Sequence, residues 1–317
     1  MTRRGVVLGA GGVLGAAWMV GALSAVQDEL GWDVREADVL VGTSAGSVLA
    51  ALLGSGIDVD TMVAHQRGEP PQVEDRLQFD VDHDAGGALP PRPRPGIGST
   101  RLVRRTLVRP RSYPPLTVLS AWLPHGQGTL APVRQLVEAA APDGWARHPA
   151  TWLVAMDYDR GRRVAFGRPG APAARLGEAA MASCSIPGWF PPVVIDGRRY
   201  VDGGACSPTS LDLLADEVLD EVFVLSPMTS FDLDSPRTLV GRLERRFRRS
   251  MTHRLLREAQ KVERAGTTVR MLSPGREDLE TIGVNLMDHR RRLDVFETSL
   301  RTSARALARA TTLQAAG

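Results

Sequence analysis

The sequence predicts an α/β fold in which a mainly parallel sheet is covered by helices on both faces. The first fifty residues alternate between short apolar runs and longer helical patterns joined by glycine-rich turns, which is the spacing of parallel strands with crossover helices. Of the 317 residues, 43% are hydrophobic and 24% are charged, and the mean hydropathy is −0.12. This composition is typical of a globular protein and excludes collagen-like, coiled-coil and disordered chains.

The elements follow in order from the N-terminus. Residues 6–8 and 39–41 are apolar strands, and each leads through a tight turn into a helix, at 14–30 and 47–53 respectively. Further along we expect helices at 132–140, 177–183 and 210–215, hairpins pairing 151–156 with 163–166 and 193–195 with 199–201, strands at 222–225 and 268–272, and long helices at about 237–265 and 287–310. No composition break is sharp, so we expect residues 1–317 to form a single domain whose part from 237 to 317 is mainly helical.

The periodic pattern stops between residues 65 and 130. Paired prolines and many arginines fill this stretch, with only short apolar pieces such as residues 116–123. A segment of this length with weak periodicity is typically a functional cap. Alternating proline and arginine also suit an extended linker. We interpret residues 65–130 as an insertion that caps the functional site, with the linker as the open alternative.

The charge of the chain limits the classes of partner that we expect, and its cysteine content indicates the redox compartment. The 39 cationic and 36 acidic side chains give a net charge of +3, which is weak support for nucleic-acid binding, so we expect no nucleic-acid partner. Cys184 and Cys206 are too few for a disulfide scaffold and suit a reducing, cytoplasmic setting. Nothing in the sequence calls for a cofactor or a metal, and the oligomeric state stays open.

The N-terminal segment resembles a signal peptide at first sight. Two arginines precede an apolar stretch that reaches Val26. Five glycines interrupt that stretch, however, and no run of about 20 strongly apolar residues follows. A strand, a tight loop and a buried helix account for the pattern better than a targeting signal does.

The most distinctive local motif is G-x-S-x-G, formed by Gly42, Ser44 and Gly46 between an apolar strand and a helix. A serine in this setting sits on a strained turn that projects its hydroxyl from the sheet, and the flanking glycines let strand and helix pack closely. The helix N-terminus behind it favours a developing negative charge. The motif therefore predicts Ser44 as a nucleophile, although a purely structural turn has the same residue types.

A glycine-rich loop closes the preceding strand, with Gly9, Gly11, Gly12 and Gly15. Because parallel strands end at the same edge of a sheet, this loop and the serine turn are expected to be neighbours. The amides of Gly11 and Gly12 would then form an oxyanion hole. A dinucleotide fingerprint would need glycine where Leu14 stands and an acid closing the second strand, and a P-loop would need Gly-Lys-Ser/Thr; the sequence has neither.

The serine also needs a base. None of the six histidines follows a strand in a convincing turn, and an α/β-hydrolase would place its serine after several strands rather than at the second. Asp202 is the stronger candidate, because it closes an apolar strand and precedes Gly203 and Gly204. An ordinary Asp-Gly turn is the alternative, and four other aspartates compete without this setting: Asp80, Asp82, Asp84 and Asp157.

Taken together, these segments resemble the patatin-like phospholipase family. The resemblance covers about residues 5–228 and includes the glycine loop, the serine motif, the stretch 182–193 and the Asp-Gly-Gly motif, with weaker similarity near 285–288. It implies a three-layer α/β/α fold, a Ser44–Asp202 dyad, and hydrolysis of acyl esters of lipids, of phospholipase A, lysophospholipase or lipase type. An acyltransferase with the same dyad and a non-catalytic lipid- or protein-binding module are the alternatives.

Two features depart from the family pattern. The family loop often carries a cation where this chain has Leu14, and Ala10 replaces its first glycine. The segment 205–209 after the aspartate motif has no mechanistic interpretation from the sequence. An aspartate with an ordinary pKa of about 3.9 is also a weak base toward serine, so a dry site that raised the pKa of Asp202 would help this chemistry, but the sequence does not show one.

The C-terminal part suggests a contact with membranes. Apolar residues recur every four positions from Leu239 to Leu255, and arginines surround them. Such a basic amphipathic helix can lie peripherally on anionic lipid. The sequence favours the ordinary alternative, in which the apolar stripe packs on the core and the arginines face solvent.

Overall fold

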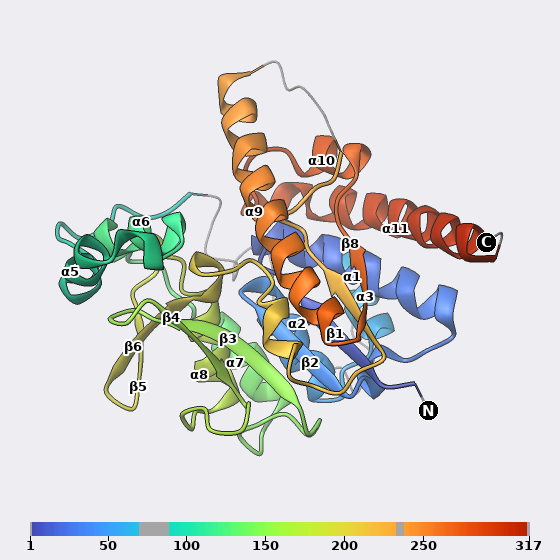
Figure 1. Cartoon of the computed structure of the whole chain (residues 1–317), viewed down its shortest axis with the longest axis horizontal. Coiled ribbons are helices and arrows are strands. Elements are labelled where there is room, and N and C mark those ends of the chain that lie inside the picture. Colours follow the sequence, from blue (N-terminus) through green and yellow to red (C-terminus); the bar gives the residue numbers. More distant parts are fainter. Residues whose placement is uncertain (1, 70–88, 233–237, 316–317) are drawn as a thin grey trace.

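The computed structural model describes residues 2–69, 89–232 and 238–315, and it has the three layers that the sequence predicts (Figure 1). One eight-stranded sheet runs in the order β5-β6-β3-β2-β1-β7-β8, with β4 paired to β3. The five strands from β3 to β8 along this path are parallel, and β4 and β6 are antiparallel to β3. The mainly parallel sheet is therefore confirmed.

The strands are β1 (Arg4–Leu8), β2 (Val39–Thr43), β3 (Thr151–Asp157), β4 (Arg162–Phe166), β5 (Val193–Ile195), β6 (Arg198–Asp202), β7 (Glu221–Leu225) and β8 (Thr268–Leu272). The α-helices are α1 (Gly12–Leu30), α2 (Ala45–Gly54), α3 (Val59–Arg67), α5 (Thr100–Val108), α6 (Pro115–Trp122), α7 (Ala131–Ala140), α8 (Leu176–Cys184), α9 (Leu239–Arg264), α10 (Arg276–Ile282) and α11 (Arg292–Ala315).

Side chains on the central strands alternate between two buried clusters. Val6 and Leu8 of β1 point toward the larger cluster, which α1, α2, α3, α7, α8 and α11 cover. Val7 points to the opposite face, where α9 packs with a short 3-10 turn at Leu211–Leu214. Because both faces are covered, the inner strands are buried throughout, as parallel sheets require.

The N-terminal helix shows why glycines interrupt its apolar pattern. A Cβ added at Gly21 would lie 2.9 Å from the backbone of α11, at the carbonyl oxygen of Phe296. The glycine therefore lets α1 and α11 cross at close range. This contact explains why one of the glycines stands in the apolar stretch.

The arrangement of β6 against β3 brings two strand ends together. Along one edge of β3, β2 pairs with its first half, where Thr43 lies opposite Val154. β4 occupies the other edge, so β6 continues the first edge with Asp202 opposite Ala155. Since β6 runs antiparallel to β2, the C-terminal ends of these two strands meet head to head. This junction juxtaposes the residues that follow β2 with Asp202.

The insertion differs in part from the expectation. Its described residues, 89–130, contain α5 and α6, whose residues Leu102 and Ala121 pack in a small core with Tyr158 at the end of β3. The Tyr158 hydroxyl donates to the Ser120 carbonyl at 2.7 Å. An extended linker is thus wrong for α5 and α6, whereas the Pro/Arg-rich residues 89–98 form neither helix nor strand. The remaining residues, 70–88, lie outside the described range, as do Asp80, Asp82 and Asp84.

Two element predictions need correction. Residues 210–215 form a 3-10 turn instead of an α-helix, and the last helix begins at Arg292 instead of 287. The short helices α3 and α10 were missed, because helices of nine and seven residues carry too little periodicity to detect.

Helix α9 divides its apolar stripe between two environments. Leu255 is buried against the sheet and Met251 is also buried, whereas Leu239 and Leu243 are 81% and 69% exposed. The favoured expectation of core packing therefore holds for the C-terminal half alone, and in Figure 1 the N-terminal half of α9 (orange) rises away from the sheet. Within the described part of the chain, no helix combines the length and apolar character that a bilayer span requires.

Candidate active site

Ser44 occupies the turn between β2 and α2, where the backbone is strained. Its φ of 55° and ψ of −125° lie in a region that side chains other than glycine rarely adopt. A Cβ added at Gly46 would meet the Leu8 carbonyl oxygen at 2.1 Å, and one at Gly42 would meet the Gly46 carbonyl oxygen at 2.3 Å. Both glycines are therefore required for α2 to approach the strands so closely.

A short chain of buried hydroxyls holds this turn in place. The Ser44 amide donates to the Ser183 hydroxyl at 2.8 Å, and Ser183 donates in turn to the Val154 carbonyl at 2.6 Å. On the other side, the Ser47 hydroxyl donates to the Ser44 carbonyl at 2.6 Å. These bonds satisfy the polar backbone of a turn that water barely reaches, and they offset the strain.

Asp202 ends β6 directly beside this turn. Its carboxylate accepts a hydrogen bond from the Gly204 amide at 2.7 Å and is almost fully buried. Burial raises the pKa of Asp202 from 3.8 to about 6, and a side-chain hydrogen bond with Ser44 together with the Gly204 amide opposes the rise. The structure thus brings Ser44 and Asp202 together in a dry environment.

The two glycines after Asp202 have steric roles. A Cβ at Gly203 would lie 2.4 Å from the Val154 carbonyl oxygen, and one at Gly204 would lie 2.9 Å from the Asp202 carboxylate. Side chains at these positions would push the loop away from β3 and displace the carboxylate. The Asp-Gly-Gly motif therefore sets the approach of Asp202 to the serine turn.

The glycine-rich loop lies against the same turn. The Gly46 amide donates to the Gly9 carbonyl at 3.2 Å, and the amides of Gly9 and Ala10 donate to the carbonyls of Leu225 and Pro208. Among the described residues, no acceptor takes the amide of Gly11 or of Gly12. Gly12 has a φ of +61°, and α1 begins there. Two free amides at a helix N-terminus form a site suited to negative charge.

Gly15 lies one turn into α1 and has a packing role. Its amide donates to the Gly11 carbonyl at 2.9 Å, and an added Cβ would lie 3.0 Å from the Pro227 ring. A Cβ at Gly11 would lie 2.5 Å from the same ring. The loop and α1 are therefore pressed against the segment that follows β7.

An apolar cavity of about 150 Å³ opens beside Ser44. Its walls come from α1, α2, α3, α7 and the 184–190 segment, with Ser44 and Gly12 among the lining residues. Most lining side chains are aliphatic, and they include Val20, Leu52 and Leu136. A cavity of this kind fits a hydrocarbon chain whose carboxyl end lies at the serine.

The cysteine and the histidines near the Ser44 turn are poorly placed to replace Ser44 as a nucleophile or Asp202 as a base. Burial raises the pKa of the Cys184 thiol to about 12, so this thiol stays protonated. Among the described residues, no histidine hydrogen bonds to Ser44 or Asp202; His125 and His148 instead contact backbone carbonyls. His65 lines the apolar cavity, which its sequence context did not indicate. No described group of three His, Cys, Asp or Glu side chains is arranged to hold a metal.

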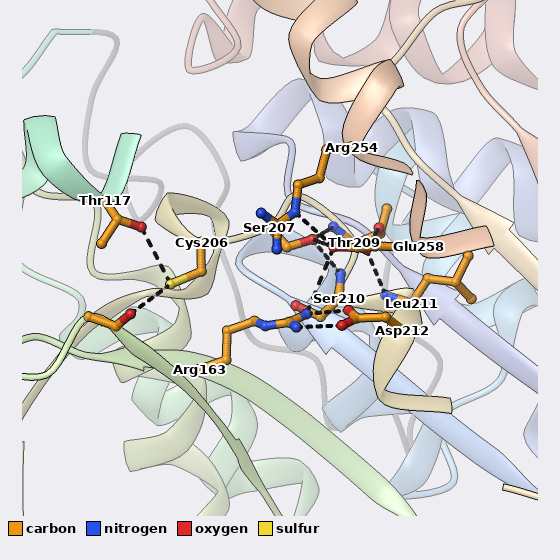
Figure 2. A network of polar contacts seen from close by, with 11 residues as sticks. Thr117, Arg163, Cys206, Ser207, Thr209, Ser210, Leu211, Asp212, Arg254 and Glu258 are labelled. Carbon is orange, nitrogen blue, oxygen red and sulfur yellow. Dashed lines mark hydrogen bonds and ion pairs between the residues drawn. The ribbon is translucent and has the colours of Figure 1, made fainter. Parts of the chain in front are cut away.

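The segment after Asp-Gly-Gly, which the sequence left unexplained, is anchored by a buried carboxylate (Figure 2). Glu258 of α9 accepts hydrogen bonds from the hydroxyls of Ser207 and Thr209, at 2.6 and 2.9 Å, and from the Leu211 amide at 3.1 Å. Arg254 pairs with the same carboxylate at 3.0 Å. The network attaches the loop after Asp202 to α9, which comes much later in the sequence.

Comparison with known proteins agrees with this geometry. The model of the patatin-like phospholipase family matches residues 6–215, about two thirds of the chain, and the match spans the glycine loop, the serine turn and the Asp-Gly-Gly motif. A comparison with curated proteins finds no match. With its three-layer fold and its motifs in the same order, the chain belongs to the patatin-like phospholipase family, whose activity is the hydrolysis of lipids.

Proposed function

We propose that this protein is a serine acyl hydrolase of lipid esters that works with a Ser44–Asp202 dyad. The observation that carries the proposal is the buried meeting of these two side chains at the head-to-head ends of β2 and β6. The free amides of Gly11 and Gly12 support it, because they supply donors for an oxyanion next to a nucleophilic turn.

The reaction proceeds through an acyl-enzyme. The Asp202 carboxylate accepts the proton of the Ser44 hydroxyl as its oxygen attacks the ester carbonyl, and the negative charge that develops on the carbonyl oxygen is stabilised by the Gly11 and Gly12 amides. The proton passes to the departing alcohol, which leaves an acyl-serine. Water then attacks the acyl-serine while Asp202 again takes a proton, and the free acid and Ser44 are regenerated.

The raised pKa of Asp202 suits this role. A base with a pKa of about 6 accepts a proton from an attacking hydroxyl more readily than one near 4, and it remains mostly ionised at neutral pH. In this proposal the adjoining apolar cavity holds the acyl chain, and the carboxylate itself is almost fully buried. A lipid acyl ester fits this pairing of a dry dyad with an aliphatic pocket.

Covalent labelling by a fluorophosphonate probe tests the proposal. We expect the wild-type protein to be labelled at Ser44 and to hydrolyse p-nitrophenyl esters, and Ser44→Ala to lose both properties while remaining folded. Ser55→Ala is the matched control, because Ser55 is a buried serine at the far end of α2. Unchanged turnover in Ser44→Ala would refute the nucleophile, and the products formed with added alcohols distinguish hydrolysis from acyl transfer.

The exposed half of α9 supports peripheral contact with anionic membranes. Leu239 and Leu243 project from a helix rich in arginine, a combination that binds anionic bilayers through both apolar and ionic contacts. Phosphatidylglycerol vesicles should sediment the wild-type protein at low salt more than phosphatidylcholine vesicles do, and the double substitution Leu239→Ser, Leu243→Ser should weaken this. Leu256→Ser, at a partly exposed site in the C-terminal half, is the control. Equal sedimentation of all three proteins would contradict the contact.

A further inference from the structure

The cavity beside Ser44 contains one feature that an acyl chain does not explain. Arg292, the first residue of α11, lines this mostly aliphatic cavity. No aspartate or glutamate is among the described lining residues, and none in the described part of the chain lies within salt-bridge distance of this guanidinium. A cation facing an apolar cavity without a carboxylate is costly unless an anion joins it there.

Hydrogen bonds hold Arg292 in place, but they do not use all of its donors. One of its terminal nitrogens donates to the Gln66 backbone carbonyl at 2.5 Å and to the Gln66 side-chain oxygen at 3.1 Å. Its Nε is buried and has no hydrogen-bond partner. A guanidinium fixed through one nitrogen, with another donor unused, is ready to bind an oxyanion through two parallel hydrogen bonds.

The chain before Arg292 packs directly on the glycine-rich loop. The Leu14 amide donates to the Leu286 carbonyl at 3.0 Å, and a Cβ added at Gly12 would lie 3.0 Å from both that carbonyl oxygen and the Met287 sulfur. Met287 and Gly12 line the same cavity as Arg292 and Ser44. α3, which carries Gln66, also contributes Met62 and His65 to this cavity. Arg292 thus shares the cavity with Ser44 and the start of α1.

We propose that Arg292 binds the phosphate of a glycerophospholipid or lysophospholipid substrate and so determines its specificity. Arg292 supplies a positive charge to the cavity beside Ser44 from the C-terminal part, outside the matched residues 6–215. The inference rests on the proposed function, because the bound phosphate lies on the substrate whose ester Ser44 attacks.

The test compares two single-chain esters that differ in one group. Hydrolysis of a 1-acyl-glycerol and of the corresponding 1-acyl-glycerol 3-phosphate is measured below the concentration at which either aggregates, so membrane adsorption does not contribute. We expect Arg292→Gln to lower the ratio of kcat/KM for the phosphorylated over the neutral ester by about 10- to 100-fold, mainly through KM, the effect of losing a hydrogen-bonded charge. Arg292→Lys should retain part of the ratio, since lysine keeps the charge without the bidentate geometry.

Arg291→Gln is the matched control. Arg291 is the exposed neighbour of Arg292, it donates to the Thr281 carbonyl, and it is not among the cavity residues; its substitution should leave the ratio unchanged. A wild-type ratio in Arg292→Gln, or an equal fall in Arg291→Gln, would overturn the assignment. Inorganic phosphate that altered neutral-ester hydrolysis in the wild type but not in Arg292→Gln would support it, because the free ion would occupy the same guanidinium. Fluorophosphonate labelling separates the two proposals. If the wild-type protein is not labelled, the Ser44–Asp202 dyad is refuted. If labelling is normal but Arg292→Gln leaves the kcat/KM ratio unchanged, only the role of Arg292 is refuted.

Discussion

Asp202→Asn should make the protein inactive yet more stable at neutral pH. In the folded protein, burial raises the pKa of Asp202 from 3.8 to about 6, so between these values the folded state binds more protons than the unfolded state. Stability therefore falls as pH rises through this window and is lowest, for this group, above pH 6. A difference of about 2 pKa units, at about 1.4 kcal/mol for each, corresponds to about 3 kcal/mol.

The substitution removes this cost without removing the contacts. The asparagine side-chain oxygen can still accept from the Gly204 amide, as the carboxylate does at 2.7 Å. We expect the free energy of unfolding of Asp202→Asn to exceed that of the wild type by up to about 3 kcal/mol at pH 8 and to approach it at about pH 3 and below, where the carboxyl is mostly protonated in both states. Urea denaturation across this pH range, followed by circular dichroism, measures the difference.

Asp212→Asn is the control of opposite sign. Two hydrogen bonds from Arg163, at 2.6 and 2.7 Å, hold the pKa of Asp212 below its ordinary value although burial opposes this. Its substitution should destabilise the protein at neutral pH and matter less as the pH falls through the ordinary range of an aspartate. Stabilisation by Asp202→Asn that did not depend on pH, or destabilisation at every pH, would refute the account of a buried, ionised carboxylate.

Three further predictions follow from the same geometry. The kcat/KM for a neutral ester should rise with pH along a single ionisation near 6, as Asp202 loses its proton, and an ionisation well above 7 in the pH profile would indicate a different base. Gly46→Ala should prevent folding, because its Cβ would lie 2.1 Å from a backbone carbonyl, whereas Gly5→Ala, which meets only side chains at 3.1 Å or more, should give folded protein; soluble yield and thermal melting compare them. Val48→Phe should shift the preference toward shorter acyl chains by filling the cavity, and an unchanged chain-length profile with p-nitrophenyl esters would place the acyl chain elsewhere.

The sequence was sufficient to predict the sheet and its motif-bearing turns because these depend on local chemistry. A short apolar run followed by glycines encodes a buried strand and a tight turn within a few residues, so β1, β2 and the turn at Ser44 lie close to their predicted positions. The parallel pairing of β1 with β2 then places the glycine loop beside that turn. The hairpin of β5 and β6 follows in the same way from its Asp196-Gly197 turn.

The features that the sequence did not reveal depend on contacts between distant segments. Glu258 anchors the loop after Asp202 from a position more than 40 residues downstream. The sequence does not distinguish it from the other charged residues of α9, because only the folded chain shows that it is buried. His65 and Arg292 enter the cavity wall from α3 and α11 for the same reason. The split of α9 into buried and exposed halves is also invisible in its regular apolar spacing, since periodicity gives the face of a helix but not where the core ends.

The C-terminal part adds residues to the site that lie outside the family match. The family match ends at residue 215, and it contains the serine, the aspartate and the free amides, which are the groups that every ester substrate would need. From beyond residue 215, α9 supplies Glu258 to hold the aspartate loop, and the chain leading into α11 supplies Met287 and Arg292 to the cavity wall. If Ser44 and Asp202 act as proposed, Glu258, Met287 and Arg292 lie outside the bond-breaking groups, so changes in the C-terminal part should alter substrate preference more than the bond-breaking chemistry.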